Sequence, residues 1–471
     1  MWTGQRSLLH SPSTPPGRNH LFVPGPVNVH ERVLRAMNVP GQNHRDPWFA
    51  DFFKACLVDS KYIFKTTEAT PFLFPGTGTG GWEAALTNTL SPGDKVVTFR
   101  YGLFSHLWID MMQRMGLEVV VIEGRWGDGA DEAKLEAILR EDKEKKIKAV
   151  CVVQNETTTG VTSDIAGCRK AMDSADHPSL LLVDGVSSIG AIDFRMDEWR
   201  VDVAVTGSQK ALSLPTGLAL VAASNKVRGR TGGPSRGRMG PCHRVGQRGT
   251  RGPPSVATHL PEEGQTVQTE SRASVSGTAP GQLNPLACMK TATSKRCYFD
   301  FADQLRTNPS GSVPYTPSLP LLYGLREAVS LLKSEGLDNV IARHHRLATG
   351  VRKAVGGWGL EVLCKDPRWY SDTLTVVEVP KGVDSNKVVK SAYAKYDLSL
   401  GVGLAELNGK VFRIGHLGNL NELMLVAALG GVEMAMRDAG IPIVPGSGVS
   451  KAIEHFHATA KVIPTRESLM V

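Results

Sequence analysis

The chain has 471 residues, of which 41% are hydrophobic and 21% charged, and its formal net charge is +8. This length predicts two domains, and the composition is typical of a soluble globular enzyme. No apolar run approaches the ~18–20 residues that a membrane helix needs, so we expect no membrane partner. Residues 227–287 carry eight arginines and three glutamates and so hold more than half of the excess charge. The remaining excess is too small to predict a nucleic-acid partner.

The two ends of the chain and its cysteines add little. The first twenty residues are rich in serine and proline, and we expect a flexible terminus before residue 21. The seven cysteines are scattered and form no CxxC pair, which is typical of reduced thiols in an intracellular protein. The last five residues, ESLMV, do not form a peroxisomal tripeptide of the SKL type.

Short apolar strands alternate with helices between residues 70 and 225. Segments such as 117–123 and 180–185 are rich in valine and leucine, whereas residues 131–142 have a helical pattern. Continuous apolar strands between helices predict an α/β fold, with a mostly parallel central sheet covered on both faces. Ligands are expected at the carboxyl ends of such strands. We assign residues 21–226 to this large domain.

Residues 227–287 break the pattern. They contain eleven glycines, seven prolines and no aromatic residue. Such a segment buries too little surface to offset its ordering entropy, so we predict a disordered insertion. Residues 288–330 are predicted to complete the large domain, and residues 331–471 to form a smaller α+β C-terminal domain.

Lys210 and Asp184 are the most informative pair in the chain. Lys210 follows a buried apolar strand within TGSQKALSLPTG, and Asp184 ends the strand before it. Pyridoxal phosphate needs an amine to hold its aldehyde and a carboxylate to keep its ring nitrogen protonated. Lys210 is therefore the candidate catalytic residue, and Asp184 the candidate partner of the ring nitrogen. Singly, Lys210 also fits a surface lysine and Asp184 a helix N-cap, but the pair on consecutive strands favours the cofactor.

A glycine-rich turn before a helix predicts the phosphate site. The backbone amides of Thr77, Gly78 and Thr79, together with threonine hydroxyls, suit a dianion at a helix start. No Gly-Lys-Ser/Thr ending follows, which disfavours ATP. Phe104, after the next strand, is a candidate to stack on the cofactor ring, with core packing as the alternative.

Two further residues complete the pattern. Thr157 lies at the end of another strand and is a candidate to hydrogen-bond the oxygen on the cofactor ring. Arg413 stands alone in an apolar strand of the C-terminal domain, and its guanidinium matches the carboxylate of an amino acid substrate. An internal salt bridge is the alternative for Arg413.

Together these stretches resemble the class V aminotransferases of the fold-type-I pyridoxal phosphate enzymes, in particular the plant peroxisomal serine–glyoxylate and alanine–glyoxylate group. The resemblance is carried by LFVPGPVN, GTGTGGWEAAL, NETTTGV, LLLVDGVSSIG, TGSQKALSLPTG and VFRIGH. It implies a fold-type-I transferase that transaminates serine or alanine with glyoxylate, so that amino acids and 2-oxo acids are its small-molecule partners. The peroxisome is the implied compartment, with mitochondrion or cytosol as alternatives.

The resemblance also implies roles that the residues alone do not. Gln209 would hold the cofactor ring together with Asp184. Tyr315 and Thr316 match a stretch that completes the phosphate site of the neighbouring subunit, so a homodimer is expected. The segment just before them, RTNPSGSVP, lacks the aromatic residues expected at such a contact.

Two other functions stay open at this point. A cysteine desulfurase of the same fold needs a reactive cysteine on a mobile loop, and Cys364 is the only candidate in the right part of the chain. A catalytically dead homologue, disabled by the insertion at 227–287, is the second alternative.

Overall fold

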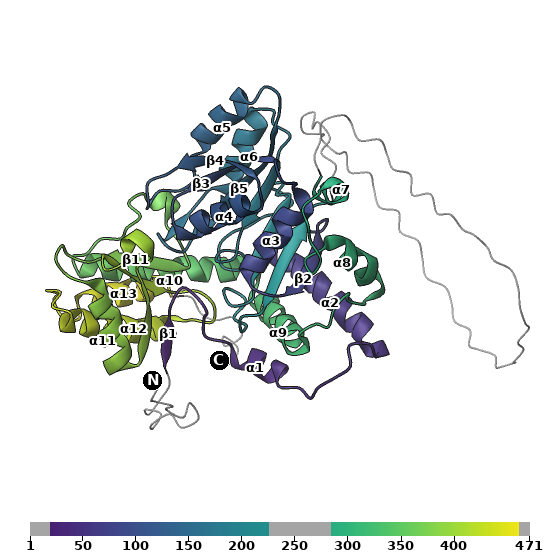
Figure 1. Cartoon of the computed structure of the whole chain (residues 1–471). Coiled ribbons are helices and arrows are strands. Elements are labelled where there is room, and N and C mark those ends of the chain that lie inside the picture. Colours follow the sequence, from purple (N-terminus) through teal and green to yellow (C-terminus); the bar gives the residue numbers. More distant parts are fainter. Residues whose placement is uncertain (1–18, 226–283, 461–471) are drawn as a thin grey trace, which may run out of the picture. The chain divides into compact units, whose positions relative to one another are not determined.

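The computed structural model describes residues 19–225 and 284–460. Most of the predicted insertion, and both ends of the chain, lie outside these ranges. Residues 284–287, which the sequence pattern placed in the insertion, instead form the N-cap and first turn of helix α7 (Pro285–Thr291), where the Asn284 side chain accepts a hydrogen bond from the Ala287 amide. The described chain folds around two main hydrophobic cores, one on each of two sheets (Figure 1).

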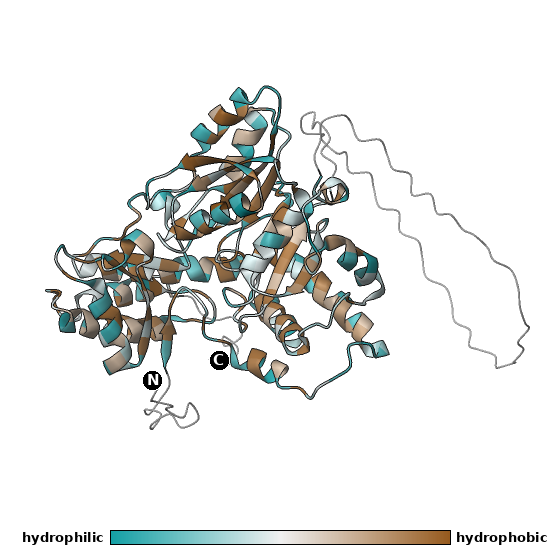
Figure 2. Ribbon diagram, viewed as in Figure 1, coloured by the Kyte–Doolittle hydropathy of each residue, from teal (hydrophilic) through white to brown (hydrophobic). Residues whose placement is uncertain are grey.

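The larger sheet has seven strands in the order β2-β10-β9-β8-β5-β3-β4. All neighbours pair in parallel except β10, which is antiparallel to both β2 and β9. The strands are largely apolar, as Figure 2 shows by their hydrophobic colour, and β5, β8 and β9 are buried along almost their whole length, whereas the edge strand β4 is only partly buried. The predicted mostly parallel α/β sheet is therefore confirmed. The strands are β2 (Thr70–Pro75), β3 (Lys95–Arg100), β4 (Glu118–Glu123), β5 (Ile147–Val153), β8 (Leu180–Asp184), β9 (Val203–Gly207) and β10 (Leu218–Ala223).

Helices pack around this sheet and begin where the sequence supplies caps. Asp131 and Asp164 accept hydrogen bonds from backbone amides in the first turns of α5 and α6, and Pro47 opens α2. A two-stranded hairpin, β6 (Asn155–Glu156) and β7 (Val161–Thr162), follows β5 directly. The helices of this part are α1 (Glu31–Met37), α2 (Pro47–Ile63), α3 (Gly78–Thr89), α4 (Leu103–Arg114), α5 (Glu132–Glu141), α6 (Ile165–Ser174), α7, α8 (Phe301–Thr307) and α9 (Leu319–Glu335).

The smaller sheet has four strands in the order β1-β12-β13-β11. Phe22, Leu398 and Phe412 are buried in the core on this sheet. The predicted smaller α+β C-terminal domain is thus present. Its strands are β1 (His20–Phe22), β11 (Leu374–Glu378), β12 (Leu398–Val402) and β13 (Val411–Gly415), and its helices are α10 (Leu337–Gly357), α11 (Ser385–Tyr396), α12 (Glu422–Asp438) and α13 (Ser447–Ala458).

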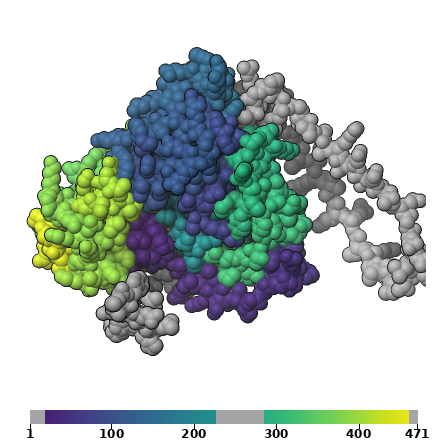
Figure 3. All heavy atoms as spheres, viewed as in Figure 1, coloured from purple at the N-terminus to yellow at the C-terminus, as the bar shows by residue number. Residues whose placement is uncertain are grey.

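The domain boundaries differ from those expected. Strand β1, near the start of the chain, pairs in parallel with β12, so the first described residues belong to the smaller sheet and not to the large domain. Figure 3 shows this N-terminal part in purple against the yellow-green C-terminal part. The second boundary falls inside α10, because Val340 packs in the larger core and Leu347 in the smaller one. A single long helix thus joins both cores, and no loop marks the division.

Among residues 19–225 and 284–460, no helix has the length and apolar character needed to cross a membrane.

Candidate active site

Two predicted residues meet at the carboxyl edge of the larger sheet. Asp184 is the last residue of β8, and Lys210 lies three residues beyond the end of its parallel neighbour β9. Parallel strands place their carboxyl ends on the same edge, where ligands bind in open α/β sheets. The sheet topology thus brings Asp184 and Lys210 to one place.

Lys210 is half-buried and lies against the loop that follows β1. Its Nζ donates a hydrogen bond of 2.5 Å to the carbonyl oxygen of Pro24. Gly25 has a φ of +116°, and a Cβ built on it would lie 2.5–2.7 Å from Cδ, Cε and Nζ of Lys210. Only glycine leaves room here for the lysine side chain. The sequence contained this PGP turn, but no local signal placed it against Lys210.

The charges around Lys210 favour its neutral amine. Burial and, to a smaller extent, the nearby Arg413 guanidinium lower the pKa of Lys210 to about 8, and Asp184 partly opposes both. A neutral amine is the form that attacks an aldehyde. The surface-lysine alternative is therefore not supported.

Asp184 is a buried carboxylate without a cation bonded to it. It is 5% exposed, and its Oδ1 accepts a hydrogen bond of 2.8 Å from the Val186 amide. Burial raises its pKa to about 7, although the Val186 amide and Lys210 act in the opposite direction. No helix lies between the end of β8 at Asp184 and the start of β9, so the N-cap alternative for Asp184 is wrong. A protonated ring nitrogen would supply the missing cation.

The predicted phosphate cradle lies at the start of α3. Thr77 is the N-cap, and its side chain makes no capping hydrogen bond. The first backbone amides of a helix have no partner within the helix and attract anions. Gly78 is buried, and a Cβ on it would lie 2.6 Å from Cγ2 of Val186, next to the turn held by Asp184. Thr77 and Thr79 are exposed.

Thr157 and Arg413 join the two sheets of the described chain. The Thr157 hydroxyl donates to Ser187 Oγ at 2.9 Å, and its carbonyl accepts from Arg413 Nη1 at 2.9 Å. Arg413 Nε donates to the Val402 carbonyl. Arg413 is 7% exposed, and within the described residues its hydrogen bonds go to backbone carbonyls and not to a carboxylate. The salt-bridge alternative is therefore not supported, and binding of a substrate carboxylate stays a prediction.

Gln209 and Phe104 complete the neighbourhood. The Oε1 of Gln209 is buried and has no hydrogen-bond partner within the described residues. Phe104 lies in the first turn of α4, half-buried against the larger core. Its backbone amide bonds to Glu156, the residue before Thr157. Glu156 was not predicted, because a glutamate in a polar stretch gives no sign of its burial.

Within the described residues, Tyr315 and Thr316 are not joined to the cluster around Lys210. The Tyr315 hydroxyl donates to Asp303 Oδ2 at 2.8 Å, and its ring stacks on Tyr298 with centroids 5.1 Å apart. The hydrogen bond to Asp303 raises the pKa of Tyr315 to about 12. Thr316 is exposed. No hydrogen bond within the described chain joins either residue to the cluster around Lys210, so their role toward a neighbouring subunit stays a prediction.

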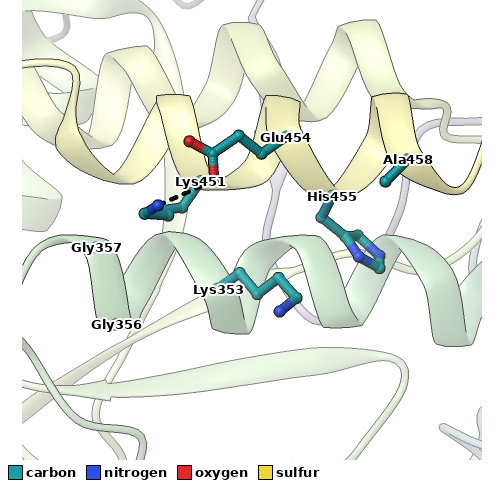
Figure 4. A pocket seen from close by; sticks show the side chains of 7 residues that line it. All are labelled: Lys353, Gly356, Gly357, Lys451, Glu454, His455 and Ala458. Atoms are coloured by element: carbon teal, nitrogen blue, oxygen red, sulfur yellow. Dashed lines mark hydrogen bonds and ion pairs between the residues drawn. The ribbon is translucent and has the colours of Figure 1, made fainter.

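Two cavities lie outside this cluster. One of about 850 Å³ reaches Ala211 and Ser213, directly after Lys210 in the chain. Another of about 670 Å³ lies between α10 and α13 (Figure 4). There Lys451 is paired with Glu454 at 2.9 Å, and Lys353 is exposed. No predicted site residue lines either cavity, so neither competes with the site at the sheet edge.

Comparison with known proteins places this arrangement in a family. The family model for class-V aminotransferases matches residues 50–252. The serine–glyoxylate aminotransferase of Methylorubrum extorquens is 49% identical over 94% of this chain and 96% of its own. The chain belongs to the class-V aminotransferases. The Arabidopsis thaliana serine–glyoxylate aminotransferase is 48% identical over 96% of this chain and 98% of its own.

The fold agrees with solved members of the class-V aminotransferases. The ureidoglycine–glyoxylate aminotransferase of Bacillus subtilis has a TM-score of 0.76 to this chain and is 25% identical, covering 95% of this chain and all of that one. The predicted fold-type-I architecture is confirmed, and the protein is an aminotransferase whose cofactor is pyridoxal phosphate.

The residues at the sheet edge fit this cofactor. Bound pyridoxal phosphate supplies an electrophilic aldehyde and a ring that withdraws electrons. Lys210 would hold the aldehyde, Asp184 the ring nitrogen, and the first amides of α3 the phosphate. Within the described residues, the buried Oε1 of Gln209 has no hydrogen-bond partner, and the buried Asp184 carboxylate, whose pKa is raised, has no cation bonded to it.

We expect cofactor capture to depend on pH through Lys210. The rate at which cofactor-free protein binds pyridoxal phosphate should rise with pH and level off above pH about 8, because only the neutral amine attacks. An ordinary lysine would level off only near pH ~10.4. Stopped-flow absorbance measures this rate.

The Arg413→Gln variant tests whether Arg413 contributes to the lowered pKa of Lys210. It removes a cation that lowers the pKa of Lys210, so the midpoint of its profile should move to higher pH. A wild-type midpoint near that of an ordinary lysine, or no movement in the variant, would contradict the assignment.

Proposed function

We propose that this aminotransferase moves the amino group of serine or alanine to glyoxylate, giving glycine and hydroxypyruvate or pyruvate. Two relatives that share nearly half of its residues over almost the full chain are serine–glyoxylate aminotransferases. The observation that carries the proposal is the buried Arg413, which within the described residues is bonded to backbone carbonyls and not to a carboxylate, and which lies close enough to lower the pKa of Lys210. An amino acid whose α-carboxylate binds Arg413 would bring its α carbon toward Lys210.

The described residues can perform the steps of transamination. Arg413 binds the substrate carboxylate and so fixes the α carbon near Lys210. The neutral Nζ of Lys210 would accept the proton from the substrate α carbon. It would then return the proton to the cofactor carbon that is bonded to the transferred nitrogen. Asp184 would keep the ring nitrogen of a bound cofactor protonated, and the positive charge there would stabilise the negative charge that develops when the proton leaves. The Thr157 hydroxyl would contact the oxygen on the ring.

Cys364, the thiol on which the desulfurase alternative depends, does not suit that reaction. Cys364 is 3% exposed, and its Sγ bonds to the Asp366 carbonyl at 3.5 Å. Burial raises the pKa of Cys364 to about 11, whereas a nucleophilic cysteine needs a lowered pKa and an accessible sulfur. The inactive alternative rests on residues 227–283, which lie outside the described chain, and the experiment below tests it.

The assembly and the compartment are further parts of the proposal. A homodimer would let Tyr315 and Thr316 of one subunit reach the phosphate site of the other, as the family resemblance implies. Sedimentation at several concentrations tests this state, and Tyr315→Phe tests the contact through the affinity for pyridoxal phosphate. The resemblance also supports a peroxisomal location, which imaging of the full chain with an N-terminal fluorescent tag would test.

The function is tested by the two half-reactions followed separately. Serine or alanine should remove the visible absorbance of the protein-bound cofactor, and glyoxylate should restore it, with glycine released in equal amount. Aspartate, which carries a second carboxylate, serves as the comparison donor. Folded protein that gains no cofactor absorbance would support the inactive alternative, and sulfide released from cysteine would support the desulfurase.

A further inference from the structure

A fully buried carboxylate lies between the groups that would hold the cofactor and the substrate. Glu156 is 0% exposed. Its Oε2 accepts a hydrogen bond of 2.9 Å from the Ser105 amide. Its Oε1 accepts from the Thr158 amide at 3.0 Å and from the Phe104 amide at 3.3 Å. This one side chain therefore joins the first turn of α4 to the loop after β6.

The start of α4 depends on this contact. Its N-cap is Gly102, which has no side chain to bond the free amides. A Cβ on Gly102 would lie 2.3 Å from Cδ of Glu156, so a glycine is needed for the carboxylate to reach the helix. Glu156, more than fifty residues away in the chain, supplies the cap that the local sequence lacks. Its negative charge also suits the positive end of the helix dipole.

The charge of Glu156 also acts on two site residues. It raises the pKa of Arg413 and that of Asp184, without being the largest influence on either. Burial alone would lower the pKa of Arg413 to about 10 or below, and Glu156 opposes this. Arg413 bonds to the carbonyl of Thr157, the residue next to Glu156. The carboxylate thus stands at the centre of the site without an opening to bind substrate itself.

We propose that Glu156 is a positioning residue for transamination, which fixes Phe104 and Thr157, the residues that would contact the cofactor ring, and balances the charge of Arg413. The inference rests on the cofactor site described above and extends it to a residue that does not touch the reacting atoms. If this is so, a change that removes the charge of Glu156 but keeps the shape of the side chain should displace Phe104 and Thr157. The substrate carboxylate should still bind Arg413.

The chain offers a matched control. Glu433 in α12 is also buried and also caps a helix, because it accepts hydrogen bonds from the amides of Gly446, Gly448 and Val449 and from the indole of Trp358. It belongs to the smaller lobe and makes no contact with Phe104 or Thr157. Glu156→Gln and Glu433→Gln therefore remove the same kind of capping charge inside and outside the site.

We expect both variants to melt at a lower temperature than the wild type. Only Glu156→Gln should weaken pyridoxal phosphate binding to the cofactor-free protein, by about tenfold, and lower kcat by about 10–100-fold with little change in KM for serine at neutral pH. At alkaline pH its KM for serine should rise earlier than that of the wild type, because Arg413 loses the charge that raises its pKa. Hydrogen exchange of the Phe104 and Ser105 amides should be faster in Glu156→Gln alone.

A second variant tests whether Glu156 affects cofactor binding through Phe104. In Phe104→Ala, which lacks the ring that Glu156 positions, adding Glu156→Gln should weaken cofactor binding much less than it does in the wild type. The proposal is overturned if Glu156→Gln binds pyridoxal phosphate with the affinity and the absorbance spectrum of the wild type. It is also overturned if Glu433→Gln changes the affinity for pyridoxal phosphate as much as Glu156→Gln does. The exchange and affinity readouts do not need turnover, so a failure to use glyoxylate would contradict the proposed function and leave this inference standing.

Discussion

Lys210→Ala should abolish transamination, with kcat at least about 1000-fold below the wild type. The variant lacks both the amine that would hold the cofactor and the group that would move the α proton, and within the described chain no other lysine hydrogen-bonds to Pro24 or lowers the pKa of Asp184. The rate of glycine formation from serine and glyoxylate measures the loss. The variant should also lack the visible absorbance that wild-type protein gains when it binds pyridoxal phosphate covalently.

Lys353→Ala is the matched control. Lys353 is an exposed lysine on α10 (Figure 4), outside the cluster at the sheet edge. Its removal should change neither absorbance nor turnover. Substantial activity in Lys210→Ala, or an equal loss in Lys353→Ala, would refute the assignment of Lys210.

Asp184→Asn should separate stability from function. Without its partner carboxylate, the ring nitrogen loses one half of a buried ion pair, which costs about 3–5 kcal/mol. The affinity for pyridoxal phosphate should therefore fall by more than about 100-fold, and turnover should fall with it. Titration of the cofactor-free variant with pyridoxal phosphate, followed by absorbance, measures the affinity.

The same variant should be more stable than the wild type when both are cofactor-free. The folded state raises the pKa of Asp184 from 3.8 to about 7. The stability that this group contributes is fully present below pH about 3.8 and is lost as the pH rises through about 7. Replacing it by asparagine should therefore raise the melting temperature most above pH 7, with a difference that shrinks toward pH 4.

Asp372→Asn should behave in the opposite way. Burial alone would raise the pKa of Asp372, but hydrogen bonds and charges from His345 and Arg352 outweigh it and lower the pKa. This carboxylate stabilises the fold above its unfolded pKa, so its loss should lower the melting temperature at neutral pH. A cofactor-free Asp184→Asn protein that melts below the wild type at pH 8 would show that Asp184 is not an uncompensated charge.

Most of the fold could be predicted from local patterns. The strands at Glu118–Glu123 and Leu180–Asp184 are short apolar runs, and each lies within one residue of the segments expected at 117–123 and 180–185. Strand β1 could not be found in this way. It has three residues, and its strand conformation comes from pairing with β12, almost 380 residues later in the chain.

The sequence by itself determined the chemistry of this protein. Lys210, Asp184, the glycine-rich start of α3 and the lone Arg413 are recognisable because each stands in a local pattern, a strand end or a helix start, that such chemistry requires. What only the tertiary structure decided is how these groups are held. Pro24 reaches Lys210 across 186 residues, and Glu156 reaches Phe104 across 52. Such contacts depend on the order of strands in a sheet and on the packing of loops at its edge, and no local periodicity encodes them.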